Sequence, residues 1–375
     1  MAEQYDVVVC GLGVMGSAAL YQLARRGQRV LGLERFAPGH DRGSSHGDTR
    51  IIRLAYFEHP SYVPLVRRAY ELWRELETEA ARPLLHVTGI AEIGPPDGTL
   101  VTGTLAAARL HGIPHELIAA PELMRRYPAF RLPPHFVGVM QPDGGYVEAE
   151  ASVQSMLALA QRHGAEIRSG EVVRAVEPAN DKARVVTDDA TIEANSAIVA
   201  AGPWMSSLLP DAKLPLRVTR QVMGWFAPKE PALFSPSRFP VFLIESAHGI
   251  HYGFPPHGAG LKVAKHHHRD EAVDPDLYDR SISADDEALV RAAVAEHLPE
   301  ANGTLLDAKT CLYTVAPDGD FIIDRLPGAP SIVLASPCSG HGFKFAPVIG
   351  EILADHASGL PPKHDISRFR VGRFR

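Results

Sequence analysis

Cysteine is scarce in this chain, with only Cys10, Cys311 and Cys338 among 375 residues. Three thiols are too few, and odd in number, for a framework of disulfide bonds. We therefore expect a reducing compartment, in which each thiol is free to pack in the core or to take part in chemistry. Cys10 follows a run of valines and is predicted to be core.

Long apolar runs are also lacking, and none is long enough to span a bilayer. Residues 1–6 hold no basic side chain, and Gly11, Gly13 and Gly16 interrupt the apolar stretch that follows. A secretory signal needs a basic start, so we expect a cytoplasmic protein without a membrane partner. The 38 basic residues are outnumbered by 44 acidic ones, which disfavours nucleic-acid binding as the main function.

Internal repeats and low-complexity tracts are absent as well, so the chain is expected to fold into ordinary compact units. Its 375 residues are more than one compact core usually holds. A domain typically has about 150 residues, so the length predicts two or three domains.

The first 34 residues read as a βαβ unit. Residues 6–10 form a short continuous apolar run, typical of a strand buried on both faces of a parallel sheet. Glycines with the spacing G-x-G-x-x-G follow at Gly11, Gly13 and Gly16, and a helix is predicted over 17–26. The first glycine makes a tight turn, the second lets the backbone approach a pyrophosphate, and the third lets helix and strand pack closely.

The next strand, predicted over 28–33, ends at Glu34. A carboxylate about 20 residues after the glycines can accept hydrogen bonds from ribose hydroxyls and repels a 2′-phosphate. The motif alone does not separate FAD from NAD. The loop 41–49 and the strand end 197–204 favour FAD, because flavoproteins of this type thread several segments along the cofactor.

The remaining pattern mixes helices and strands. Helices are predicted over 61–78, 151–163, 285–297 and 346–356, and strands at 85–93, 136–141, 197–201, 222–227, 241–245, 251–253, 260–264 and 332–335. We predict an α/β protein with a Rossmann-like, discontinuous FAD-binding domain, formed by 1–85, 146–215 and 320–375. A second, β-rich substrate domain comprises 86–145 and 216–319, with the ligand pocket between the two.

Several stretches, taken together, resemble the sarcosine oxidase family of FAD-dependent amine oxidoreductases. They are the glycine fingerprint, SHGDTRIIR at 45–53, YGFP at 252–255 with GLK at 260–262, TCLYT at 310–314 and SGHGFKF at 339–345. The resemblance spans nearly the whole chain and implies a monomeric oxidase. Its expected reaction converts a small anionic N-methyl amino acid and O2 into formaldehyde, the demethylated amino acid and hydrogen peroxide.

In that family FAD is attached through its 8α-methyl group to the cysteine of a C-x-Y-T segment, so the resemblance implies a covalent bond to Cys311. The alternative is a buried cysteine that serves as core, and Cys338 is predicted to be structural. The residues predicted to bind the cofactor are Gly11, Gly13, Gly16, Glu34, Arg35, Ser45, His46, Thr49, Arg50, Val173, Gly202, Trp204, Cys311, Gly340, Gly342, Phe343 and Lys344.

The resemblance also implies roles for four cations. Lys262 resembles a lysine that hydrogen-bonds through water toward flavin N5 and promotes reaction with oxygen, and Arg50 resembles an arginine on the other face of the flavin. Arg53 and Lys344 resemble a pair that binds the substrate carboxylate. A helical turn would place Arg50 and Arg53 side by side. The alternatives are a surface lysine at 262 and a solvated basic face.

Histidines and tyrosines complete the predicted site. His46 and His266 are catalytic candidates near the flavin, while Tyr252, Tyr313 and Gly340 are predicted to contact the substrate. Structural hydrogen bonds and an aromatic core are the alternatives for these side chains. No metal is expected, because only two of the histidines at 266–268 would share one side of a strand and no third ligand has suitable spacing.

Three other functions stay open at this point. The first is a related oxidase of a cyclic or primary amino acid, such as pipecolate, a D-amino acid or glycine. The second is a FAD dehydrogenase that passes electrons to a carrier protein. The third is a non-catalytic nucleotide-binding or sensor protein, which the motif context of the cations and Cys311 disfavours.

Overall fold

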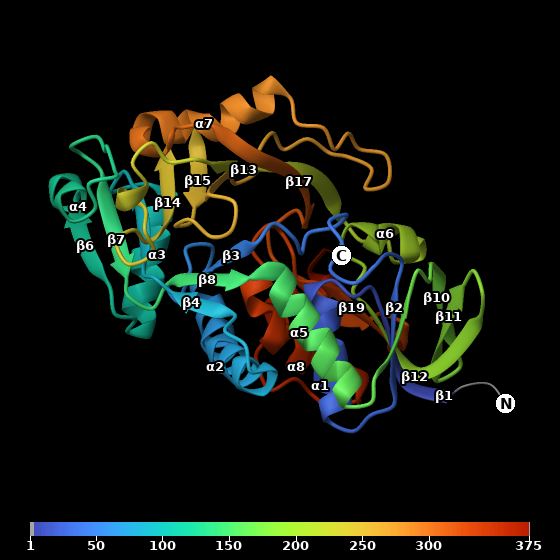
Figure 1. The fold of residues 1–375 in the computed structure, drawn as a ribbon. Coiled ribbons are helices and arrows are strands. Elements are labelled where there is room, and N and C mark those ends of the chain that lie inside the picture. The colour runs from blue at the N-terminus through green and yellow to red at the C-terminus, as the bar shows by residue number, and fades with distance from the viewer. Residues whose placement is uncertain (1–3, 375) are drawn as a thin grey trace.

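The computed structural model describes residues 4–374, whose strands form three sheets (Figure 1). Residues 1–3, part of the N-terminal stretch considered above, and residue 375 lie outside the described residues. Within that range, no helix is both long and apolar enough to cross a membrane.

The first sheet contains the predicted βαβ unit, with its central strands parallel. β1 is buried at Val7, Val8 and Val9, as expected for a strand covered on both faces. The strands of this sheet are β1 (Gln4–Cys10), β2 (Val30–Glu34), β9 (Glu166–Ser169), β10 (Val173–Ala179), β11 (Lys182–Thr187), β12 (Thr191–Val199), β18 (Ile322–Leu326) and β19 (Ala329–Ser336).

A layer of helices covers one face of this sheet, as Figure 1 shows. Its members are α1 (Val14–Arg25), α2 (Val63–Ala80), α5 (Ala149–Arg162) and α8 (Ala346–Ala357). α1 and α8 cross so closely that a Cβ on Gly350 would lie 2.7 Å from the carbonyl oxygen of Ala18. The last α-helix of the described residues, α8, is thereby fixed against the first, α1.

The second large sheet has eight strands and a mostly antiparallel order, in which only β5 and β14 run parallel among its described pairs. Its strands are β5 (Ile90–Gly94), β6 (Glu116–Ala119), β7 (Val137–Gln141), β13 (Arg217–Phe226), β14 (Val241–Ser246), β15 (Gly249–Gly253), β16 (Leu261–Lys265) and β17 (Leu305–Val315). The helices beside it are α3 (Thr99–His111), α4 (Ala120–Arg126) and α7 (Ala284–His297).

A small third sheet joins the two units. It pairs β3 (Thr49–Ile52) and β4 (Leu85–Val87) with the two edges of β8 (Gly145–Glu148). The short helix α6 (Met205–Leu208) follows the glycine turn after β12.

The predicted α/β class with a Rossmann-like unit and a β-rich unit is confirmed. The first sheet draws its strands from residues 4–34, 166–199 and 322–336, and the second from 90–141 and 217–315. These segments agree with the two predicted units, while the domain boundaries themselves stay a prediction.

Some local predictions were wrong. The strand predicted over 85–93 is two strands of different sheets, β4 and β5, separated by a turn in which Gly89 has φ +73°. Residues 49–52 form a strand and no helical turn, so Arg50 and Arg53 are not neighbours on a helix face. Helices α3 and α4 and the long strand β17 were not predicted.

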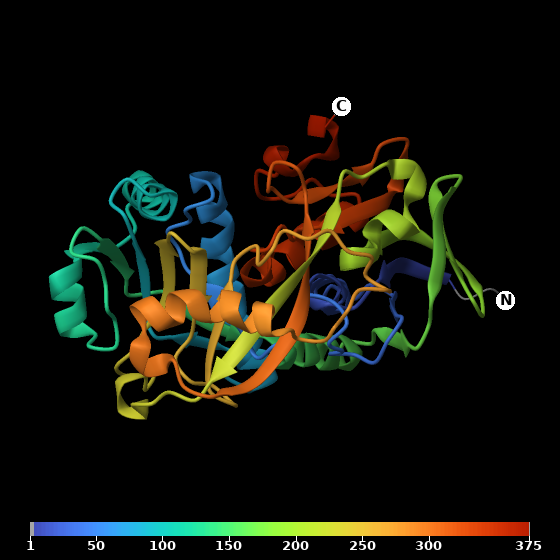
Figure 2. The same cartoon turned by 90° about the horizontal axis from the view of Figure 1, so that it is seen from above.

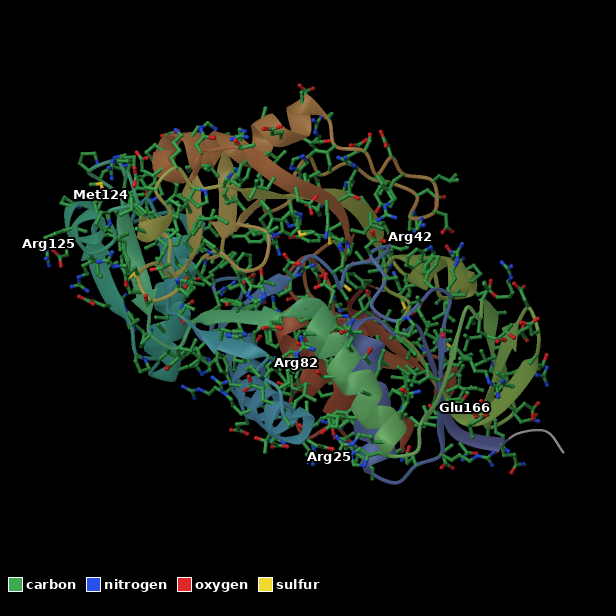
Figure 3. The ribbon with its side chains drawn as sticks, in the orientation of Figure 1. Arg25, Arg42, Arg82, Met124, Arg125 and Glu166 are labelled. Atoms are coloured by element: carbon green, nitrogen blue, oxygen red, sulfur yellow. The ribbon has the colours of Figure 1, made fainter. Side chains whose placement is uncertain are left out.

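Charged side chains populate the outer surface (Figure 3). Arg25, at the end of α1, pairs with Glu75 at 3.3 Å, and Arg125, on α4, pairs with Glu122 at 2.7 Å. Such exposed pairs contribute little to stability, because water and salt screen them. Stability therefore depends mainly on the apolar cores between the layers.

Candidate active site

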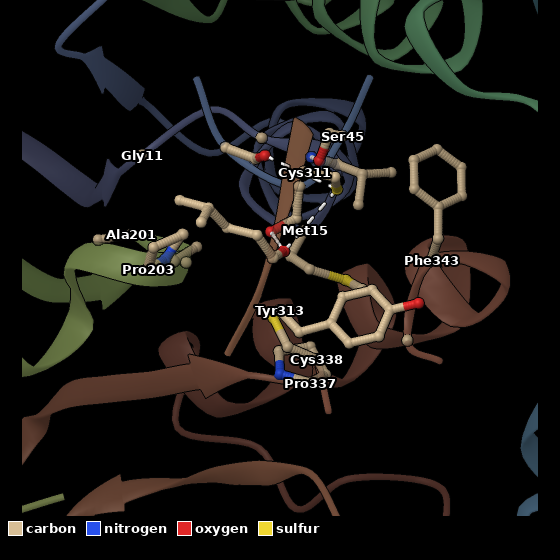
Figure 4. A pocket seen from close by; sticks show the side chains of 18 of the residues that line it. Gly11, Met15, Ser45, Ala201, Pro203, Cys311, Tyr313, Pro337, Cys338 and Phe343 are labelled. Atoms are coloured by element: carbon tan, nitrogen blue, oxygen red, sulfur yellow. Dashed lines mark hydrogen bonds between the residues drawn. The ribbon is translucent and has the colours of Figure 1, made fainter. Parts of the chain in front are cut away.

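A cavity of about 430 Å³ is lined by residues from both large sheets. Figure 4 shows Cys311, Tyr313 and Met15 between Gly11 at one side of the view and Phe343 at the other. The predicted site residues on its wall are Gly11, Gly13, Glu34, Arg35, Ser45, Arg50, Arg53, Val173, Gly202, Trp204, Tyr252, His266, Cys311, Tyr313, Gly340, Gly342, Phe343 and Lys344. The predicted residues that do not line it are Gly16, His46, Thr49 and Lys262.

The glycine turn after β1 forms one end of the cavity. Gly11 has φ +91°, and a Cβ there would lie 2.7 Å from the carbonyl oxygen of Ala200. Gly16 lies behind the wall, where a Cβ would be 1.8 Å from the carbonyl oxygen of Gly11. Glycine is thus required for backbone packing at both positions. α1 begins at this turn, so its N-terminal end faces the cavity.

Glu34 lies at the end of β2, as predicted. Its carboxylate accepts hydrogen bonds from the backbone N–H groups of Leu12 (2.8 Å) and Phe36 (2.9 Å), and His40 Nε2 lies 3.4 Å away. Burial acts to raise the pKa of Glu34, but these hydrogen bonds outweigh it and hold the pKa below its usual value. The carboxylate is therefore ionised and oriented to accept further hydrogen bonds.

Aromatic and charged side chains surround the same end of the cavity. The guanidinium of Arg35 lies 5.8 Å from the ring centre of Trp204 and forms an ion pair with Asp276 at 2.8 Å. Trp204 also donates its indole N–H to Asp276 at 3.0 Å. Gly202 adopts φ +52° in the turn that precedes this tryptophan. Asp276, which the sequence analysis missed, ties a segment of the β-rich unit to this end.

Cys311 lies on β17, buried but on the cavity wall. Arg50 places a guanidinium nitrogen 3.8 Å from its sulfur and donates to the carbonyl oxygens of Ser44 and His46. A fixed cation therefore lies beside the thiol on the cavity wall. Cys338, predicted to be structural, is also on the wall, and burial raises the pKa of its thiol to about 12.

Two buried cations, Arg53 and Lys344, meet at another part of the wall. Arg53 forms an ion pair with Glu58 at 2.7 Å and lies 3.5 Å from Glu92. Burial acts to lower the pKa of Arg53, but both carboxylates outweigh it and raise that pKa. Burial acts to raise the pKa of Glu58, and Arg53 outweighs it to give about 2. Arg53 therefore stays charged although fully buried.

Lys344 has no carboxylate within hydrogen-bonding distance among the described residues. Its Nζ donates to the carbonyl oxygen of His341 at 2.6 Å and to the hydroxyl of Tyr56 at 3.2 Å. Burial, together with the charge of Arg53, lowers the pKa of Lys344 to about 7. An anion in the cavity would restore its charge, because a nearby negative charge favours the protonated amine.

Lys262 is buried beside the cavity, in β16. Its Nζ donates to the carbonyl oxygens of Gly47 (2.6 Å) and Thr49 (2.7 Å). Burial lowers the pKa of Lys262 well below its usual value, and Arg50 adds to the effect. The lysine therefore holds the backbone that leads into β3 and presents its nitrogen behind the cavity wall.

The two candidate histidines have different surroundings. His46 is buried, and neither ring nitrogen has a hydrogen-bond partner among residues 4–374. His266 lines the cavity, and its Nδ1 lies 3.4 Å from the Tyr313 hydroxyl. Burial lowers the pKa of each to about 3, so both rings are neutral near pH 7. Two polar atoms on His46 are thus left for a bound molecule.

Tyr252 and Tyr313 face the cavity from β15 and β17. Burial raises the pKa of both phenols, which keeps them protonated as hydrogen-bond donors. Gly340 has φ +81°, and a Cβ there would lie 2.6 Å from the Tyr313 ring. A glycine is therefore needed for the loop to pass this tyrosine.

The histidine run at 266–268 does not lie on one strand, so the predicted face-sharing of His266 and His268 was wrong. β16 ends at Lys265, and His267 has φ +55°. His268 therefore points elsewhere, to Asp286 at 3.0 Å. Among the described residues, no group of three acidic, histidine or cysteine side chains is arranged to hold a metal ion.

Several wall residues escaped the sequence analysis, notably Glu58, Gln221 and Met223. Glu58 lies five positions after Arg53, and an acidic residue so close to a candidate anion-binding arginine was an available signal. Gln221 and Met223 are separated by two positions on β13, where the strand period places them on one face.

The residues present fit FAD. The glycine turn removes side chains where a pyrophosphate would approach, Glu34 is placed for a ribose, and the buried His46 has two ring nitrogens without a partner among the described residues. The matching family model is described as FAD dependent oxidoreductase and covers residues 6–356. The chain belongs to this family. It therefore depends on FAD.

Two curated relatives match this chain over nearly its full length. It is 40% identical over 380 residues to the monomeric sarcosine oxidase of Streptomyces avermitilis, covering 100% of this chain and 99% of that protein. It is 36% identical over 383 residues to the N-methyl-L-tryptophan oxidase of Salmonella heidelberg, covering 99% of each. Within the flavoproteins, the chain is thus a member of the sarcosine oxidase family, as its motifs predicted.

Among solved structures, NikD, an unusual amino acid oxidase essential for nikkomycin biosynthesis, is similar over 98% of both chains. The TM-score is 0.87 and the sequence identity is 28%. The arrangement of the two large sheets is therefore shared with an oxidase whose sequence is considerably more distant than those of the curated relatives.

Proposed function

We propose that this chain oxidises small N-methyl amino acids, of which sarcosine is the simplest. Family membership makes it a FAD-dependent oxidoreductase that acts on CH–NH groups with oxygen as acceptor. The observation that carries the narrower proposal is the pair of buried cations, Arg53 and Lys344, on the wall shared with Cys311. The proposed products are formaldehyde, the demethylated amino acid and hydrogen peroxide.

Arg53 and Lys344 would bind the substrate carboxylate. Arg53 offers a planar fork of donors and Lys344 a point charge. Glu58 neutralises part of the positive charge, so a carboxylate that arrives competes with Glu58 for Arg53. With Glu92 protonated, Arg53, Lys344 and the ionised Glu58 leave room for one further negative charge in the cluster.

Gly11, Gly13, Glu34 and Cys311 are among the residues that would hold FAD, which supplies the acceptor for a hydride when bound. We propose covalent attachment at Cys311, supported by its place on the cavity wall and by its position in the C-x-Y-T segment, with the guanidinium of Arg50 3.8 Å from its sulfur. His46 would offer its ring nitrogens to the same cofactor.

The substrate amine must lose its proton before it can donate a hydride. The charges of Arg50, Arg53 and Lys344 disfavour an ammonium ion in the cavity. His266, neutral and on the wall, offers an acceptor for a remaining amine N–H, while Tyr252, Tyr313 and Gly340 enclose the small organic part. These residues would exclude water and hold the methyl group at the reacting end.

Lys262 is proposed to assist oxygen. Burial disfavours the charged form of Lys262, and negative charge that develops on oxygen during its reduction would favour that form and be stabilised by it. Its nitrogen lies behind the wall, near Gly47 and Thr49, so the effect would act through space or through a water molecule.

Assembly and location are part of the same proposal. We propose a monomer, which the description of the Streptomyces avermitilis relative as monomeric supports. A cytoplasmic location is supported by the three free thiols at Cys10, Cys311 and Cys338.

The test is a peroxide-coupled screen of purified yellow protein against N-methyl, cyclic and primary amino acids. We expect turnover with sarcosine and release of formaldehyde. Ammonia instead of formaldehyde would show a primary amino acid oxidase, and oxidation without peroxide in air would show a dehydrogenase. A yellow protein that oxidises none of these amines would contradict the proposal.

A further inference from the structure

Tyr56 lies behind the two cations that are proposed to bind the carboxylate. Its side chain has no exposure to solvent, and it does not belong to the cavity wall. It nevertheless contacts both Arg53 and Lys344. A substrate would therefore meet the two cations and not Tyr56 itself.

The contacts use two different parts of the tyrosine. The guanidinium carbon of Arg53 lies 4.3 Å from the centre of the Tyr56 ring, within the range of a cation–π interaction. The Nζ of Lys344 lies 3.2 Å from the Tyr56 hydroxyl and donates to it. One side chain thus offers negative electrostatic potential to both cations, which repel each other.

The direction of the hydroxyl is fixed from the other side. His341 Nε2 lies 3.0 Å from the carbonyl oxygen of Gly319, which can only accept, so Nε2 carries the proton of the neutral ring. Nδ1 is then an acceptor, and the Tyr56 hydroxyl donates to it at 2.7 Å. The oxygen lone pairs of Tyr56 remain available to Lys344.

The ring itself is held by aromatic neighbours. Tyr62 lies 5.0 Å from it and Phe345 lies 5.2 Å from it, measured between ring centres. Such pairs restrict a buried ring to one orientation. The position of Tyr56 is therefore determined by the core and not by the substrate.

We propose that Tyr56 is a positioning residue, whose ring face orients Arg53 and whose hydroxyl orients Lys344 so that both bind one substrate carboxylate. The inference rests on the proposed function, since it names the residue that aligns the two cations for an amino acid. It predicts that the carboxylate is recognised less well when the hydroxyl is removed, although no atom that touches the substrate has changed.

The test compares Tyr56→Phe with wild type on sarcosine and on sarcosinamide, which lacks the carboxylate. Loss of one hydrogen bond to a charged group is expected to raise KM for sarcosine about tenfold, with kcat nearly unchanged. KM for the amide should stay constant. Tyr56→Leu removes the ring as well and should raise KM for sarcosine further.

Tyr62→Phe is the matched control. Tyr62 is equally buried and its hydroxyl donates to Asp320 at 2.8 Å, but it has no hydrogen bond to either cation. This variant should retain the wild-type preference for sarcosine over sarcosinamide. Variants are compared only at equal flavin content, so that misfolded protein is not counted.

Unchanged KM for sarcosine in Tyr56→Phe, or an equal loss for sarcosine and its amide, would overturn the inference. A wild-type enzyme without activity on sarcosine is a different result, because it contradicts the proposed function before any variant is made. In that case acetate binding, followed by the flavin absorbance, still tests Tyr56: weaker binding in Tyr56→Phe than in Tyr62→Phe supports it, and equal binding refutes it.

Discussion

At the scale of single residues, the cavity is organised by buried charged side chains. Arg53 is paired with Glu58, while Lys344 and Lys262 are solvated mainly by backbone carbonyl oxygens. An isolated charge in such surroundings is costly, so each cation is sensitive to any anion that enters. The cavity is thereby prepared to accept negative charge, whether from a carboxylate or from reduced oxygen.

Replacement of Cys311 by Ser should leave the flavin non-covalent. Serine lacks the thiolate that would form the bond, so acid precipitation should release the yellow colour into the supernatant. Cys338→Ser is the control, because it alters a second thiol of the same wall. Colour that stays with the Cys311→Ser polypeptide would exclude attachment at this position.

Lys262→Met should slow oxidation of the reduced flavin by oxygen much more than it weakens substrate binding. Removal of one electrostatic contact of this kind typically costs about a hundredfold or more in rate. Stopped-flow reoxidation in air-saturated buffer measures the step directly. Normal oxygen kinetics in this variant would reject the role.

Anion binding should weaken as the pH rises through about 7. Lys344, with a pKa lowered to about 7 by burial, is charged below that value and neutral above it. Burial also raises the pKa of Glu92 to about 7, so its ionisation adds repulsion in the same direction.

Acetate is the suitable ligand for this test, because it has no amine and stays ionised across the range. Titration of the flavin absorbance with acetate gives the dissociation constant at each pH. Lys344→Met should bind more weakly at low pH and show a smaller dependence, since only Glu92 still titrates. An unchanged profile in that variant would contradict the assignment.

At the scale of secondary-structure elements, the sequence predicted those helices and strands whose signals lie close together in the chain. The unit β1–α1–β2 was found because buried strands, glycine spacing and helical periodicity all lie within 34 residues. The other site motifs were found because each is a short contiguous segment that resembles the sarcosine oxidase family. Eighteen predicted residues then proved to share one cavity wall.

The remaining elements depend on partners far away in the sequence. β3 forms because residues 49–52 pair with β8, nearly 100 positions later, and no local spacing reports that pairing. α3 was missed because Gly103 interrupts its pattern, yet a Cβ there would lie 2.4 Å from the carbonyl oxygen of Phe57. Tertiary packing thus selects a residue that helix propensity disfavours.

Gly16→Ala should separate α1 from β1. The added Cβ would lie 1.8 Å from the carbonyl oxygen of Gly11, so the glycine turn must move. We expect loss of bound FAD and destabilisation of about 1–3 kcal/mol or more, measured by flavin content and thermal unfolding. Gly372→Ala, where nothing lies within 4 Å, is the control and should resemble wild type in both.

At the scale of the whole molecule, the segment between β16 and α7 ties the β-rich unit to the nucleotide-binding unit (Figure 2). Asp276 contacts Arg35 at 2.8 Å, and Arg280 forms an ion pair with Asp41 at 2.7 Å. Both pairs are largely exposed, so each contributes only about 0–1 kcal/mol. We expect these two ion pairs to limit local opening of this segment more than they stabilise the whole fold.

The double variant Asp41→Ala, Asp276→Ala should therefore unfold at nearly the wild-type temperature but be cleaved faster within residues 267–283. Limited proteolysis followed by mass spectrometry measures both the rate and the position. Asp188→Ala, which removes an exposed ion pair with Arg174 on the β10–β11 hairpin, is the control. Equal cleavage rates would show that these contacts do not hold the segment.

The position of β19 in the first sheet has a consequence for biosynthesis. This strand, residues 329–336, lies beside β12 in the sheet that begins with residue 4, and α8 then packs on α1. During synthesis the amino-terminal half emerges before β19 does. Until then, β12 lacks its neighbouring strand in the first sheet. The flavin cradle can close only once residues 329–336 have emerged and paired with β12, so cofactor loading must wait for this late strand.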